Sequence, residues 1–148
     1  RYEAREYIDN YLTNYQGVRK YMKQVVEDAK AIGYTATLYG RRRYIPELKS
    51  SNFNIRQGAE RIALNTPIQG TAADIIKIAM IRVRDELKKA EIDAHLILQV
   101  HDELLIEAHK DVADKAYEIL VSSMEGCMPL SVPLDVDAHI GSTWFDAK

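Results

Sequence analysis

The sequence has almost none of the features of a disulfide-bonded or membrane-bound protein. Its 148 residues include a single cysteine, Cys127, so no disulfide can form within the chain and a cysteine-based metal site is not expected. No apolar run approaches the roughly 20 residues that a membrane-spanning helix needs, and no signal peptide opens the sequence. Internal repeats and low-complexity segments are also absent. We therefore expect a cytoplasmic protein with no membrane partner, since a reducing compartment is the default for such a chain.

The net charge of −2 does not by itself indicate a polyanionic partner. The placement of the charges is more informative. Between Arg41 and Arg61, six Lys or Arg residues stand against two acidic residues, Glu47 and Glu60, which gives a local charge of +4 in a chain that is otherwise acidic. Such a stretch is typical of a phosphate-contacting patch or of a solvated loop, and these residues alone leave both interpretations open.

The apolar content of 47% is enough for a buried core, and much of it recurs with helical spacing. Apolar residues three and four apart predict helices over residues 1–15, 18–32, 52–65, 70–90 and 112–124. Gly33 is placed to cap the second helix, Ser51 or Asn52 the third, and Asp111 the last. Pro67 is expected to kink the chain or to start a fresh helix.

Two of these helices carry further expectations. Tyr7, Tyr11 and Tyr15 follow one face of the first helix, and we expect them in a core or an interface, with a base-stacking platform as the alternative. The helix over 70–90 is expected to be scaffold, with Asp74 on its solvent-facing side.

Strand patterns occur in two other segments. Residues 34–45 predict a short hairpin that turns at Gly40 and is followed by an irregular loop from Pro46 to Ser51. Residues 132–140 alternate strictly between apolar residues and other types, which predicts a half-buried strand.

The segment over 96–108 places three ionisable residues, His101, Asp102 and Glu103, between two short apolar runs. The runs are rich in Ile, Leu and Val and favour strands, so the polar residues are expected at a hairpin tip. A three-residue loop would put the alternating apolar residues of both strands on one face: Leu96, Leu98, Val100, Leu104, Ile106 and Ala108. Such a tip can present carboxylate oxygens to a hard cation, and an ordinary solvated turn is the alternative.

Two strings extend this interpretation. Gln-Val-His-Asp-Glu-Leu at 99–104 resembles the carboxyl-terminal catalytic motif of the family A DNA polymerases, the bacterial DNA polymerase I type. The segment 60–77, which begins Glu-Arg-Ile-Ala-Leu-Asn-Thr-Pro, resembles another block of that family. The resemblance covers essentially the whole chain and implies an α+β fold, with an antiparallel palm-type sheet and a catalytic β-hairpin backed by long amphipathic helices. It places trailing fingers helices and a short hairpin in 1–48 and the C-terminal part of the palm in 49–148.

The resemblance also implies roles for particular residues. Asp102 is expected to be a catalytic metal ligand, Glu103 a weaker catalytic candidate, and His101 a contact to the primer strand. DNA contacts are expected from Arg56, Arg61, Asn65 and Gln69. Arg, Asn and Gln side chains suit the minor-groove edges of base pairs, where acceptors recur for every sequence.

The implied reaction is nucleotidyl transfer, in which the primer's 3′-hydroxyl attacks the α-phosphate of a deoxynucleoside triphosphate, with two Mg²⁺ ions about 3.5–4 Å apart. The expected partners are primer–template DNA, deoxynucleoside triphosphates and a missing N-terminal part of the polymerase, which would carry another metal-binding aspartate and the nucleotide-binding fingers helix. We therefore expect a fragment, excised or one half of a split polymerase, that does not polymerise alone. A non-catalytic DNA-binding fragment and a metal-dependent nuclease that uses Asp102, Glu103 and Glu107 are the alternatives.

Overall fold

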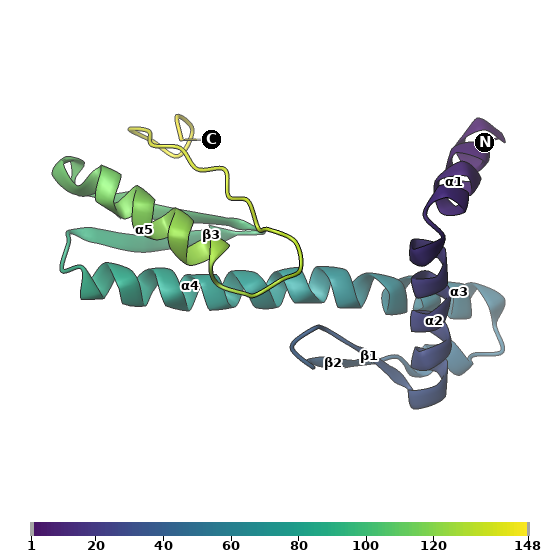
Figure 1. The fold of residues 1–148 in the computed structure, drawn as a ribbon. Coiled ribbons are helices and arrows are strands. Elements are labelled where there is room, and N and C mark those ends of the chain that lie inside the picture. Colours follow the sequence, from purple (N-terminus) through teal and green to yellow (C-terminus); the bar gives the residue numbers. More distant parts are fainter. Residues whose placement is uncertain (1, 148) are drawn as a thin grey trace. The chain divides into compact units, whose positions relative to one another are not determined.

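The computed structural model describes residues 2–147 and has an α+β architecture (Figure 1). Its contacts divide the chain into two compact units, Arg1–Thr71 and Ala72–Lys148. The division at residue 48 that the resemblance implies concerns the domains of a complete polymerase and stays a prediction. Among the described residues, no helix is both long and apolar enough to cross a membrane.

The helices expected in the first unit are confirmed. They are α1 (Tyr2–Asn14), α2 (Gln16–Ile32) and α3 (Phe53–Asn65). Gly33 ends α2 with a φ of 84°, and its N–H bonds the Ala29 carbonyl at 2.8 Å. Asn52 caps α3, because its side-chain oxygen accepts from the Asn54 and Ile55 N–H groups.

The tyrosines of α1 differ from the expectation of a core position. The exposed fractions of Tyr7, Tyr11 and Tyr15 are 76%, 52% and 57%, so none of the three is buried within the part of the chain that the structure describes. The rings of Tyr11 and Tyr15 lie 4.8 Å apart between their centroids, with their planes tilted by 39°. The core assignment is therefore wrong for this chain, while an interface role stays a prediction.

The expected hairpin of the first unit is present as β1 (Tyr34–Ala36) paired antiparallel with β2 (Arg42–Tyr44). Gly40 lies in the connection with a φ of 79°, a conformation that favours glycine. The predicted irregular loop is instead a 3₁₀ turn, η1 (Pro46–Lys49), which forms because Leu48 is buried. The core of this unit joins α2, η1 and α3 through a few small and branched side chains: Ala29, Ile45, Leu48, Ala59 and Ala63.

The second unit contains a long helix, a hairpin and a second helix (Figure 1). These are α4 (Thr71–Lys89), β3 (Ala94–Val100), β4 (Glu103–Ala108) and, after the short turn η3 (Lys110–Val112), α5 (Ala113–Glu125). Both helices and the hairpin contribute to one core: Val83, Leu87, Ala94, Ala116 and Ile119, with Leu104, Ile106 and Ala108 packed against it.

Two polar residues of this unit do not lie where the sequence patterns place them. Asp74 is buried, although helical spacing puts it on the solvent-facing side of α4. Asp111 does not act as a cap through its side chain. Its own N–H instead donates to the ring of His109 at 3.4 Å.

The predicted strand over 132–140 is wrong, because the described residues hold no strand there and the segment has no ladder partner. Its alternation is nevertheless visible in the exposure. Leu134, Val136 and Ala138 are half-buried, whereas the residues between them are exposed. A strand needs a neighbour to pair its backbone groups, so the pattern alone does not produce one.

We predict that Leu87→Ala lowers the free energy of unfolding by about 2–5 kcal/mol, because it leaves a cavity in the core of the second unit. Leu87 is 3% exposed there. Ile81→Ala, on the same helix at 55% exposure, is the control and should change stability by less than about 0.5 kcal/mol. Urea denaturation measures both variants, and equal losses would contradict this core.

Candidate functional site

The hairpin tip is tighter than the sequence pattern suggests. Val100 pairs directly with Glu103, so the connection contains only His101 and Asp102 instead of three residues. The register shifts between Leu96 and Leu98, where Ile97 is the extra residue of a β-bulge. The predicted three-residue loop is therefore wrong.

The bulge changes which side chains share a face. Paired residues of an antiparallel ladder lie on the same face, so Ala94, Leu96, Ile106 and Ala108 face together, as expected. Beyond Ile97, a shift of one residue sends side chains to the other face. Leu98 and Val100 consequently lie with Leu105 and Glu103 on the face away from Leu104. Leu98 is 40% exposed, and its expected place on the buried face is wrong.

The tip has a strained but supported backbone. His101 adopts a φ of 53°, in the left-handed region that few residues other than glycine enter. The Gln99 side-chain nitrogen donates to the His101 carbonyl at 2.6 Å, which fixes that peptide. Strain of this kind persists where the surrounding structure holds it, and it is common at functional sites.

The carboxylates of Asp102 and Glu103 are both exposed at this tip. Among the described residues, no hydrogen bond or ion pair engages either one, so their oxygens are available to an external ligand. No cluster of three or more metal-binding side chains occurs within residues 2–147. Two free carboxylates suit a cation such as Mg²⁺, which takes one or two protein carboxylates and completes its shell with water and phosphate oxygens. The residues present therefore fit a shared metal site but not a complete one.

The helix α3 presents the other predicted residues. Ala59 and Ala63 are buried on its inner face, and positions two residues later lie nearly opposite on a helix. Arg61, Asn65 and Gln69 are accordingly all exposed. We call these three exposed residues the outward row, although Gln69 lies beyond the end of α3.

Arg56 has a different setting from this row. Its side-chain Nη1 donates to the Ser50 carbonyl at 2.8 Å, and its guanidinium lies 5.7 Å from the centre of the Phe53 ring. Arg56 is therefore held against the start of its own helix.

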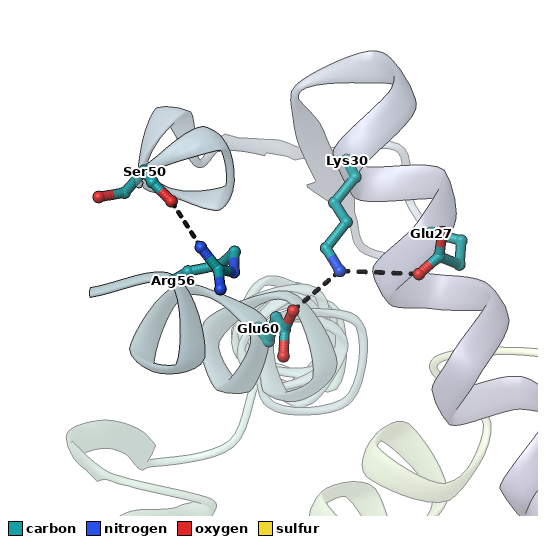
Figure 2. A network of polar contacts seen from close by, with 5 residues as sticks. All are labelled: Glu27, Lys30, Ser50, Arg56 and Glu60. Atoms are coloured by element: carbon teal, nitrogen blue, oxygen red, sulfur yellow. Dashed lines mark hydrogen bonds and ion pairs between the residues drawn. The ribbon is translucent and has the colours of Figure 1, made fainter. Parts of the chain in front are cut away.

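An ion pair fixes α3 to α2 close to Arg56 (Figure 2). The Lys30 ammonium lies 2.8 Å from the Glu60 carboxylate and 3.6 Å from that of Glu27, so it reaches between the two helices. The hydrogen-bonded Glu60 carboxylate raises the pKa of Lys30 above its ordinary value of 10.5. Glu60 immediately precedes Arg61, so the pair restrains the helix turn from which the outward row begins.

Gln69 belongs to a turn that helical periodicity did not predict. The segment η2 (Thr66–Gly70) is a π-helical turn that contains Pro67 and lies between α3 and α4. The kink expected at Pro67 stays a prediction. The signal available in the sequence was Pro67 itself, which has no N–H to give to the helix. Lys30 was also missed, and no motif marks it. Gln99 opens the family string at 99–104, but its bond to the His101 carbonyl was not predicted.

The geometry is that of an α+β chain with exposed carboxylates on a hairpin tip and an outward row of Arg, Asn and Gln on a helix. The chain belongs to DNA polymerase family A, whose profile matches residues 1–146. It is 53% identical over 148 residues to DNA polymerase I of Bacillus subtilis and 51% identical over the same length to that of Bacillus caldotenax. The thermostable DNA polymerase I of Thermus filiformis is 44% identical over 146 residues.

A solved structure shows the same likeness. The POL domain of Pol1 from M. smegmatis, in complex with a DNA primer-template and dNTP, matches with a TM-score of 0.94 and 46% identity. The match covers 98% of this chain and 26% of that one. The chain spans only 17% of the length of the B. subtilis, B. caldotenax and T. filiformis relatives, although they match all or nearly all of it.

We predict that Lys30→Met lowers the free energy of unfolding at pH 7 by less than about 1 kcal/mol, because the Lys30–Glu60 pair is partly exposed and screened. The raised pKa makes this contribution fully present below pH 10.5. It is lost as the pH rises through the higher pKa of the folded state. Denaturation of the unmodified chain and of Lys30→Met between pH 8 and 11.5 should show the difference between their free energies of unfolding shrinking as the pH rises. Lys23→Met, on the same helix, is the control and should show no such change. A difference that grows with pH would contradict the pairing.

Proposed function

We propose that the chain supplies the C-terminal part of the palm of a template-directed DNA polymerase that acts in the cytoplasm. One observation supports this most strongly. The family string at 99–104 folds into a supported hairpin tip with two unengaged carboxylates, Asp102 and Glu103. The relative that was solved with a DNA primer-template and dNTP supports the same substrate class.

The proposed reaction joins the primer's 3′-hydroxyl oxygen to the α-phosphorus of a deoxynucleoside triphosphate and breaks the bond to pyrophosphate. Asp102 is the residue that would hold Mg²⁺, with Glu103 as a second candidate beside it. When bound, the metal would stabilise the negative charge of the attacking and leaving oxygens. Asp102 has to be held rigidly for this, and the Gln99–His101 bond within the two-residue turn provides the rigidity.

The same tip offers a contact to the primer. The His101 side chain is exposed and adjacent to Asp102 in the turn, so a strand that approaches the carboxylate would also meet the imidazole. We assign His101 to the primer strand and not to metal, because Mg²⁺ prefers oxygen ligands.

We assign the recognition of the duplex to Arg61, Asn65, Gln69 and Arg56. Their donors suit the minor-groove acceptors that every base pair presents, so they would test the geometry of the pair without reading its sequence. The basic stretch around them would add contacts to phosphates.

The chain does not provide a complete active site. Two ions need more ligands than the one or two carboxylates at the tip. The remaining ligands and the nucleotide-binding helix would come from the rest of the polymerase, joined to this chain or supplied as a second half.

We predict that the 148 residues alone do not extend a primer, whereas a chimera that carries them in place of the matching segment of B. subtilis DNA polymerase I does. In that chimera, Asp102→Asn should reduce primer extension with Mg²⁺ by more than the roughly 10–100-fold typical when a residue that only orients a metal ligand is replaced. Asp93→Asn, an exposed aspartate at the other end of the hairpin, is the matched control and should leave the rate unchanged.

Three results would contradict this assignment. Mg²⁺-dependent synthesis by the isolated chain, lost in Asp102→Ala, would show that the site is complete. DNA cleavage by the isolated chain with a divalent metal would favour the nuclease alternative. An active chimera that tolerates Asp102→Asn would instead favour the non-catalytic DNA-binding fragment.

We predict that Asn65→Ala weakens binding of the chain to a primer–template duplex by about 2- to 10-fold, which corresponds to the loss of one hydrogen bond. The loss of affinity should be the same for duplexes of different sequence. Fluorescence anisotropy at several salt concentrations measures the affinity, and Arg61→Ala should also reduce its salt dependence. Asn14→Ala, exposed at the end of α1, is the control. An effect of Asn65→Ala confined to particular base pairs would contradict minor-groove contact of this kind.

A further inference from the structure

We infer that the π-helical turn η2, held in place by the β1–β2 hairpin, is a positioning device that brings Gln69 into line with Arg61 and Asn65. This inference rests on the proposed DNA contacts of the three residues. It assigns the positioning of Gln69, separate from any DNA contact, to Pro67, Thr71 and the hairpin residues that bond the turn.

Regular helix geometry would not align the row. Four residues of an α-helix turn through about 400°, so each step of four drifts about 40° around the axis. Arg61 to Asn65 is such a step, since both lie in α3. Asn65 to Gln69 runs through η2, where the wider i→i+5 turn takes more residues to close. Four residues then fall short of a full turn, so the second step offsets the drift of the first.

Pro67 opens this turn. In a regular helix the Ala63 carbonyl would accept from the N–H of residue 67, which proline does not have. The Thr35 hydroxyl, from β1, instead approaches the Ala63 carbonyl oxygen at 3.4 Å in a buried setting. The hairpin thus supplies the donor that the helix lacks.

The far end of the turn is bonded to the hairpin as well. The Thr71 hydroxyl donates to the Pro67 carbonyl and accepts from the Leu38 N–H at 3.0 Å. The Arg41 side chain donates to the Gly70 carbonyl at 2.9 Å. A Cβ at position 70 would lie 2.7 Å from the Thr37 methyl carbon, so glycine is what allows this close approach. Both ends of the wide turn are therefore bonded to one rigid element.

The test releases the turn and asks whether Gln69 loses its contribution. Pro67→Ala restores the missing N–H, and Thr71→Val removes the hydroxyl that holds the Pro67 carbonyl while keeping the side-chain shape. In the unmodified chain, Gln69→Ala should weaken binding to a fluorescent primer–template duplex by about 3- to 10-fold. In the Pro67→Ala/Thr71→Val chain it should weaken binding less than about 2-fold, because Gln69 is already out of line.

Asn65→Ala separates positioning from general destabilisation. Asn65 lies before the turn, so Asn65→Ala should weaken DNA binding equally in the unmodified chain and in Pro67→Ala/Thr71→Val. If the double substitution instead loosened the whole unit, the effects of Asn65→Ala and Gln69→Ala on binding would both become smaller. Thr71→Ser keeps the hydroxyl, so in that background Gln69→Ala should weaken binding as much as in the unmodified chain. Thr13→Val, which removes a threonine hydroxyl from α1, should leave all of the measured affinities unchanged. An equal Gln69→Ala loss in both backgrounds would overturn the proposal.

A second measurement does not depend on DNA. A scalar coupling across the hydrogen bond from the residue 67 nitrogen to the Ala63 carbonyl carbon should appear by NMR in Pro67→Ala/Thr71→Val, as the turn closes to a regular helix. Its absence would overturn the proposal. If neither Asn65→Ala nor Gln69→Ala affects binding in the unmodified chain, the DNA contacts under the proposed function fail, and this coupling still decides whether the turn is held as we infer.

Discussion

The need to pair backbone polar groups constrains each part of this chain that bears on function. A buried carbonyl or N–H without a partner costs about as much as a lost hydrogen bond. Where regular structure is interrupted, side chains provide partners: the Thr35 hydroxyl donates to the buried Ala63 carbonyl beside Pro67, and the Gln99 amide donates to the exposed His101 carbonyl at the hairpin tip. Of the residues proposed for function, Gln69, His101 and Asp102 lie at these two interruptions, and the others lie in or beside regular structure. Regular helix or strand would have left neither the exposed carboxylates nor the row that ends in Gln69.

The packing behind these interruptions is modest and local. Alanines at 29, 59 and 63 let α2 and α3 approach closely, and the Lys30–Glu60 pair spans them at the edge of that contact. Small side chains bury little apolar area each. The orientation of α3 therefore depends on several weak restraints acting together. The hairpin tip differs, because the strands behind it share a core with both α4 and α5.

The helices and their ends could be predicted from the sequence, because they depend on residues close together in the chain. Strand register and strand pairing could not, because they depend on hydrogen bonds between separate segments. Helix ends such as Gly33 and Asn52 were predictable because their chemistry is local. The register of the hairpin tip was not predictable. Ile97 and Leu98 are both apolar, so either could occupy the buried face, and the position of the bulge decides which one does. The strand over 132–140 failed for a related reason: its alternation is real, but a ladder depends on a partner elsewhere. The site residues came from family strings, and nothing in composition or spacing would have selected Asp102 over other turn aspartates.

The half-buried segment at 134–138 and the incomplete metal site at Asp102 are consequences of one condition. Each has the local form of a functional element, alternating burial in one case and unengaged carboxylates in the other, and each lacks the group that completes it. A sheet edge and a two-ion site both require chain that is distant in sequence. A chain that spans 17% of its relatives holds the local half of both interactions. Under the proposed function, the strand that would pair with residues 134–138 and the ligands that would complete the tip both come from the rest of the polymerase, so we expect the sheet and the active site to form together.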